Sequence, residues 1–188
     1  MSRVATLMVL LLALSLGSGV PRPASGGKRD EDEHHHGRSD VRRLLTFRTM
    51  FGVDGAFVGD AHPIGDIAGD ELPWEIDFAL GRLDTDGKLF LRVEGLVFKD
   101  DPSVPEELRG INDEEEFRAA VTCLTEEDGD VVSRTMVTEG FPATEDGDAL
   151  IRARLELPDP CIAPAVLVLA GSEDKWFAVT GFETEEEE

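Results

Sequence analysis

The 188-residue sequence has little or none of several residue types, and each shortage excludes a class of protein. Tyrosine is absent, and there are only two cysteines. Two cysteines are too few for a disulfide-dense mini-protein or for a zinc site built from several thiolates. Basic residues are also scarce, with 18 Lys+Arg against 40 Asp+Glu and a net charge of −22. Nucleic-acid backbones and anionic membranes attract basic surfaces, so we expect this protein to bind neither.

The common catalytic and cofactor motifs are missing as well. The sequence contains no CxxC pair, no Walker loop and no GxGxxG that follows a strand, so redox and nucleotide chemistry have no support. No G-x-S-x-G elbow surrounds Ser103, Ser133 or Ser172, although His62 would be available as a base. Acidic residues are too abundant for a glycosidase-like pair to be singled out.

The N-terminus has the three-part order of a secretory signal over residues 1–20. Arg3 precedes the apolar run Val4–Leu16, and small residues follow at 17–19. The run has 13 residues, whereas a membrane-spanning helix needs about 20. We therefore expect no membrane span and a secreted protein, extracellular or periplasmic.

Residues 21–43 read as a disordered linker, because they are charged and almost free of apolar side chains. His34, His35 and His36 follow four acidic residues, and such a tract can hold transition metals loosely. A solvated polar linker is the favoured interpretation, since adjacent residues cannot impose tetrahedral geometry. Residues 183–188 form an acidic tail with five glutamates, and its role stays open.

Strand signals dominate from Trp74 onward. In 88–98, Leu89, Leu91 and Val93 share one face while Arg92 and Glu94 share the other. Asp-Gly turns separate several of the runs. The expected strands are 75–83, 88–98, 117–123, 131–138, 149–157, 162–170 and 176–182.

About seven short strands of this kind predict an all-β fold for residues 44–182. We expect a two-sheet antiparallel β-sandwich of immunoglobulin-like type with one disulfide. Residues 47–71 are expected to form irregular strands and a long loop, and 103–117 at most one short helical turn. Trp74 and Trp176 are interpreted as core residues at the edges of the sheets.

The two cysteines are predicted to form a disulfide. Cys123 lies mid-strand on the apolar face, and Cys161 opens the strand 162–170. In a secreted protein such a pair normally oxidises. We expect the bridge to join a central strand to the second sheet, with two free buried thiols as the alternative.

Three acidic turns are the candidate metal sites. Their carboxylates could supply oxygen ligands to Ca²⁺, although none fits the EF-hand pattern and hairpin turns need Asp and Gly in any case. The Ca²⁺ candidates are Asp84, Asp86, Asp128, Asp130, Asp146 and Asp148. A true site would require two of these turns to meet at one end of the sandwich.

Two short motifs carry a family resemblance. Pro160-Cys161-Ile162-Ala163-Pro164 and the run WFAVTG at 176–181, with stretches 117–123 and 141–144, resemble a group of uncharacterised secreted bacterial proteins. The resemblance covers residues 72–182. It implies that both cysteines and the closing strand belong to a shared framework, and it implies no activity.

The function that these observations favour is a secreted, non-catalytic β-sandwich that binds an unknown protein or surface ligand or has a structural role. The alternatives are a small secreted hydrolase with unidentified acidic catalytic residues and a Ca²⁺-dependent surface module. A binding module should show an exposed apolar patch or an unpaired strand edge.

Overall fold

The computed structural model of the chain describes residues 41–181. The predicted signal peptide, the His34–His36 tract and the acidic tail lie outside the described residues. The predicted linker extended to Arg43, but Arg43 is the first residue of strand β1. Its side chain pairs with Asp84 of the neighbouring strand at 2.7 Å, so the linker boundary was placed too late.

The described residues form β-strands, one short 3₁₀ helix and no α-helix. The 3₁₀ helix η1 spans Gly55–Phe57. None of the described residues belongs to a helix long and apolar enough to cross a membrane. The strands are β1 Arg43–Phe47, β2 Met50–Gly52, β3 Ala68–Gly69, β4 Trp74–Glu75, β5 Phe78–Asp84, β6 Lys88–Glu94, β7 Val97–Phe98, β8 Glu116–Glu127, β9 Asp130–Val137, β10 Phe141–Pro142, β11 Ala149–Arg154, β12 Ile162–Ala170 and β13 Lys175–Thr180.

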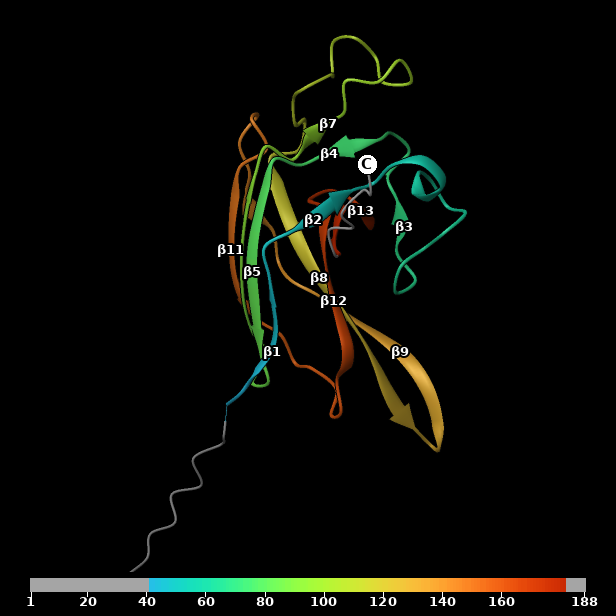
Figure 1. The fold of residues 1–188 in the computed structure, drawn as a ribbon, viewed down its shortest axis with the longest axis vertical. Coiled ribbons are helices and arrows are strands. Elements are labelled where there is room, and N and C mark those ends of the chain that lie inside the picture. The colour runs from blue at the N-terminus through green and yellow to red at the C-terminus, as the bar shows by residue number, and fades with distance from the viewer. Residues whose placement is uncertain (1–40, 182–188) are drawn as a thin grey trace, which may run out of the picture. The chain divides into compact units, whose positions relative to one another are not determined.

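Two main sheets pack as the layers of a β-sandwich, as the sequence predicted (Figure 1). Sheet A has the strand order β1-β5-β6-β11. Sheet B has the order β10-β8-β12-β13-β2, with β9 added to β8 and β3 added to β13. The short pair β4-β7 closes the upper end in Figure 1. All strand pairs are antiparallel except β13 with β3.

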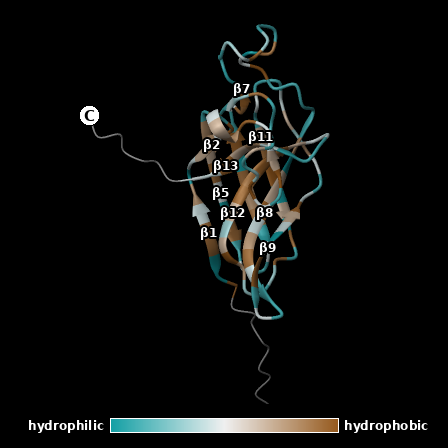
Figure 2. Ribbon diagram, turned by 90° about the vertical axis from the view of Figure 1, so that its right-hand side faces the viewer, coloured by the Kyte–Doolittle hydropathy of each residue, from teal (hydrophilic) through white to brown (hydrophobic). Residues whose placement is uncertain are grey.

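The core lies between the sheets and follows the predicted alternation. In β6, Leu89, Leu91 and Val93 are buried while Lys88 and Arg92 are exposed. Figure 2 shows hydrophobic residues concentrated along β5, β8 and β12 and hydrophilic ones on the turns at both ends.

Strand β12 is buried on both faces over residues 166–170. One face meets sheet A, and residues 54–70 lie over the other face of sheet B, where they contact β13 and β9. The Phe57 ring lies 6.2 Å from that of Trp176, and the Gly65 carbonyl accepts a hydrogen bond from Thr135 at 2.7 Å. This double burial explains the nearly uninterrupted apolar run in the sequence.

Most predicted strands are confirmed, but two of them are interrupted. The predicted strand 75–83 divides into β4 and β5, and 88–98 divides into β6 and β7. The second break falls at Gly95, which has φ +66°, a backbone conformation that glycine adopts readily. The chain turns there from β6 into β7. Residues 102–110 form turns, in line with the weak helical signal there.

The disulfide between Cys123 and Cys161 is confirmed, but the strands it joins differ from the expectation. We expected it to connect the two sheets. Strand β12 pairs directly with β8, with Ile162 opposite Leu124, so the bridge lies within sheet B. The prediction was wrong because the alternation of apolar and polar residues shows which residues form strands but not which strands are neighbours in a sheet.

Candidate functional site

The candidate site arises where the chain changes sheets. Strand β1 pairs with β5 as far as Phe47 opposite Gly81. After two residues, β2 begins in the other sheet, with Met50 opposite Thr180. The Phe47 ring occupies the space above Gly81, where an added Cβ would lie 2.1 Å from the ring. A side chain at position 81 would therefore displace Phe47 and disturb this crossing.

The crossing leaves part of β5 without a neighbour on one side. Residues Phe78, Ala79 and Leu80 pair with β6. Among residues 41–181, no strand pairs with these three residues on their other side, because β1 has already left the sheet. Strand β5 therefore presents a short free edge, the feature by which sheets accept an additional strand.

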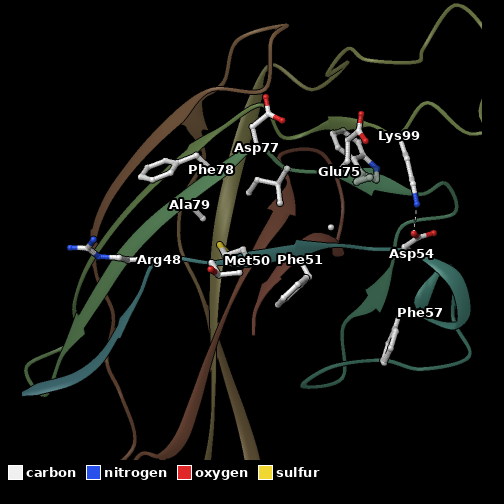
Figure 3. A pocket seen from close by; sticks show the side chains of 14 residues that line it. Arg48, Met50, Phe51, Asp54, Phe57, Glu75, Asp77, Phe78, Ala79 and Lys99 are labelled. Carbon is white, nitrogen blue, oxygen red and sulfur yellow. Dashed lines mark hydrogen bonds and ion pairs between the residues drawn. The ribbon is translucent and has the colours of Figure 1, made fainter. Parts of the chain in front are cut away.

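Between this edge and β2 lies a cavity of about 720 Å³, which we call the β2–β5 groove (Figure 3). Figure 3 shows Arg48 and Phe78 pointing to one side and Phe51 and Phe57 pointing downward. The lining residues are Arg48, Thr49, Met50, Phe51, Gly52, Asp54, Phe57, Trp74, Glu75, Ile76, Asp77, Phe78, Ala79 and Lys99.

The floor of the groove is apolar and firmly held. Met50 and Ala79 are buried, and so is Trp74 behind them. The Trp74 ring stacks on Phe177 with centroids 3.8 Å apart, and its indole N–H donates to the Asp70 carboxylate at 2.9 Å. Burial of Asp70 raises the pKa of its carboxyl group, partly offset by this hydrogen bond. These contacts hold Trp74 in a fixed position beneath the groove.

One end of the groove carries an ion pair between Asp54 and Lys99. Asp54 also accepts the Gly55 backbone N–H at 2.8 Å. The hydrogen bond from Lys99 lowers the pKa of Asp54, and the same contact raises the pKa of Lys99. Both groups are therefore charged at neutral pH and fix the position of η1 beside the groove.

The rim offers charged and aromatic groups to a ligand. Neither Glu75 nor Asp77 has a hydrogen-bond or ion-pair partner for its carboxylate within residues 41–181, and Figure 3 shows both pointing upward. Phe51, Phe57 and Phe78 are 44%, 48% and 41% exposed. The three phenylalanines border the groove, with Phe78 on β5 and the other two on the opposite side.

The predicted Ca²⁺ candidates lie on three separate turns. Asp84 and Asp86 flank the β5–β6 turn, where Asp86 pairs with Lys88 at 2.9 Å. Asp146 and Asp148 precede β11 at the opposite end of sheet A, as the register of Ala149 with Val93 requires. Asp128 and Asp130 lie at the tip of the β8–β9 hairpin (Figure 1).

Other groups already engage some of these carboxylates. Asp86 also pairs with Arg154 at 2.5 Å, and Asp148 accepts the Gly95 N–H at 3.1 Å. Within the described residues, the structure brings together three other acidic side chains, those of Asp70, Glu71 and Glu173. Trp74 and Lys175 hold two of them. The Ca²⁺ site stays a prediction.

The other residues considered from the sequence are dispersed. His62 packs against Phe57, with ring centroids 5.8 Å apart. Ser133 bonds Thr122 on the neighbouring strand at 3.0 Å, and Ser172 donates to Glu114 at 2.8 Å. Ser103 donates to Asp101. These contacts are local and do not bring a serine to His62.

The groove residues were missed by the sequence analysis. Arg48 and Phe51 fall in the stretch expected to be irregular, and Phe78 looked like an ordinary strand residue. The available signal was the presence of Phe51 and Phe78 in the short runs 47–52 and 74–78. That signal gives no indication that the two runs face each other.

No family model, curated protein or solved structure matches this chain.

Proposed function

We propose that residues 41–181 form the binding domain of a secreted protein, and that the β2–β5 groove receives an extended peptide segment from a protein partner. The observation that carries the proposal is the free edge of β5 at Phe78–Leu80, which borders a cavity of about 720 Å³. A peptide in β conformation can hydrogen-bond to such an edge while its alternate side chains enter the cavity.

The chemistry of the lining indicates which peptide fits. Side chains that point into the groove would meet the apolar floor at Met50 and Ala79, and the exposed rings of Phe51 and Phe78 border the groove. The unpaired carboxylates of Glu75 and Asp77 favour Lys or Arg at the rim of the groove. The described residues hold 13 basic and 30 acidic side chains, so a basic peptide would also associate faster at low salt.

Secretion is supported by the cysteine chemistry. Both cysteines of the chain form one disulfide, and such bridges persist in oxidising compartments. The signal-like N-terminus is consistent with that location. A binding partner would then be another extracellular or periplasmic protein.

Selection from a displayed peptide library on the full-length protein tests the proposal. We expect basic–apolar peptides to be enriched. The double variant Phe51→Ala with Phe78→Ala should weaken their binding by about tenfold or more, since two exposed aromatic contacts are removed. Leu150→Ala is the matched control, because Leu150 is also 44% exposed but lies on β11, two strands away from the free edge of β5.

Backbone methylation of a selected peptide distinguishes strand addition from side-chain binding. In strand addition, N-methyl groups at alternate residues abolish binding, whereas those between them are tolerated, because only every second N–H faces the edge. Equal effects at consecutive positions would contradict strand addition. Peptides that bind the double variant as well as the wild type would show that the groove is not the site.

A further inference from the structure

A basic face lies on the outside of sheet A, on a protein that is otherwise acidic. Six of the 13 basic residues between 41 and 181 point outward from its four strands, whereas these strands place only two acidic residues, Asp84 and Glu94, on the same face. The six are Arg43, Arg82, Lys88, Arg92, Arg152 and Arg154. The charge of the domain is therefore strongly segregated.

The strand register arranges this face in rows. Arg82 and Arg152 are the direct cross-strand neighbours of Phe90, one on each side. Their guanidinium carbons lie 5.4 and 5.6 Å from the centre of the Phe90 ring. We call Arg82, Phe90 and Arg152 the arginine row. Stacking on the ring restricts both guanidinium groups and leaves their N–H donors exposed.

Acidic neighbours neutralise the rest of the face but not this row. Arg43 pairs with Asp84 at 2.7 Å, Arg92 pairs with Glu94, and Lys88 and Arg154 share Asp86. In the described part of the chain, Arg82 and Arg152 have neither an ion pair nor a hydrogen bond from their side chains. Two oriented guanidinium groups are thus available to carboxylates.

Two shallow cavities of about 440 and 400 Å³ flank the row, and Phe90 and Arg152 line both of them. Arg82 lines the second. A ligand in these cavities would make van der Waals contacts in addition to its ionic contacts with the arginines. A long anionic polymer is a poor match, because a chain with 40 acidic and 18 basic residues would repel the parts that extend beyond this narrow face.

We propose that the arginine row binds the acidic segment Glu183–Glu188 of the same chain. The described part ends at Gly181, which lines a cavity of about 620 Å³ together with Thr46 and Arg48. Thr46 is the cross-strand neighbour of Arg82, so the chain leaves the sandwich at the β1 edge beside the row. The segment carries five glutamates.

The segment is long enough to reach across the row. The seven residues 182–188 can reach at most about 23 Å, and the three interstrand spacings from β1 to β11 add up to about 14 Å. Attachment to the same chain gives the carboxylates an effective concentration of the order of millimolar, so weak individual contacts suffice. Guanidinium groups bind carboxylates through paired, charge-assisted hydrogen bonds.

Side-chain NMR of the full-length protein tests the contact. In one variant all five glutamates of the segment become glutamine. We expect the Nε–Hε resonances of Arg82 and Arg152 to differ between wild type and this variant at low ionic strength, and the difference to vanish in about 1 M NaCl, where the Debye length is near 3 Å. Resonances that coincide at low ionic strength would overturn the proposal.

Competition in trans supplies the second measurement. The peptide Glu-Thr-Glu-Glu-Glu-Glu should bind the glutamine variant, and Arg82→Gln with Arg152→Gln in that background should weaken binding about tenfold or more. Arg134→Gln is the matched control, because Arg134 is an exposed arginine on β9 in the other sheet. Equal binding by the arginine variants, or row resonances that respond to inorganic sulfate or an oligonucleotide but not to the peptide, would assign the face to another anion or to none.

Discussion

Asp70 shows how one buried side chain supports the groove floor at a cost. A single carboxylate oxygen, Oδ2, accepts both the Trp74 indole N–H at 2.9 Å and the Leu72 N–H at 3.3 Å. The same burial that protects these bonds disfavours the ionised form, and so raises the pKa of Asp70. When the pKa of an acid is higher in the folded state than in the unfolded state, the folded protein loses stability as the pH rises from the unfolded-state pKa, 3.8 for Asp70, through the folded-state pKa.

Asp70→Asn separates the two effects, since an amide oxygen can accept the same two bonds without carrying charge. We expect the free energy of unfolding of this variant to increase relative to that of wild type as the pH rises from about 4 to 7, because only wild type is destabilised by ionisation of Asp70. Asp70→Ala leaves both donors without an acceptor and should cost about 1–3 kcal/mol. Urea unfolding across this pH range measures both, and a pH-independent difference for Asp70→Asn would contradict the argument.

At the scale of elements, the disulfide secures an irregular end of β12. The ladder between β12 and β8 is regular from Ala165 to Ala170, but its register shifts between Ile162 and Ala165. Ala163 has φ +48° there, a conformation that non-glycine residues rarely adopt. The Cys123–Cys161 bridge lies beyond this irregularity, and therefore holds the first residues of β12 beside β8 where the pairing is irregular.

Replacing both cysteines by alanine should lower the free energy of unfolding by about 4 kcal/mol, because the bridge closes a long loop in the unfolded chain. Hydrogen exchange should accelerate first at Leu124 and Ile162, beside the bridge, and least at the far end near Ala170. Urea unfolding with amide exchange provides the measurement. Uniform acceleration along β12 would show that the bridge does not act locally.

At the scale of the whole molecule, excess negative charge opposes the compact state. The chain carries 40 acidic and 18 basic residues, and folding brings the like charges closer together. Salt screens such repulsion beyond a Debye length of about 10 Å at 0.1 M. The basic face of sheet A concentrates much of the compensating charge on one side of the domain.

We expect the melting temperature of the protein to rise from low to moderate NaCl, because screening relieves this repulsion. CaCl₂ at matched ionic strength, with EDTA as the reference, separates screening from specific binding. A rise specific to Ca²⁺ would support the predicted acidic-turn site, and an equal response would leave the turns as solvated hairpins. A melting temperature indifferent to salt would contradict the screening argument.

Local features of the sequence predicted local structure well. The alternation in 88–94 and the Asp-Gly turn before it predicted the hairpin of β5 and β6, and the double burial of residues 166–170 followed from their apolar run. Trp74 and Trp176 were correctly placed in the core. Each of these properties depends on residues that are close together in the sequence. It can therefore be predicted from the sequence alone.

Neither the groove nor the arginine row could be derived in this way. Arg82 and Arg152 were recognisable as outward-facing residues, but their position on either side of Phe90 depends on the strand order β5-β6-β11.

The sequence by itself determined the approximate positions of most strands from residue 75 onward, which of their faces are apolar and that the two cysteines would pair. Only the tertiary structure decided that β12 is the neighbour of β8, so that the disulfide lies within one sheet, and that β1 leaves β5 at Gly81 and opens the groove. The physical reason is the range of the interactions. Alternation and turn geometry act between adjacent residues, whereas strand order results from the packing of two whole sheets over one core.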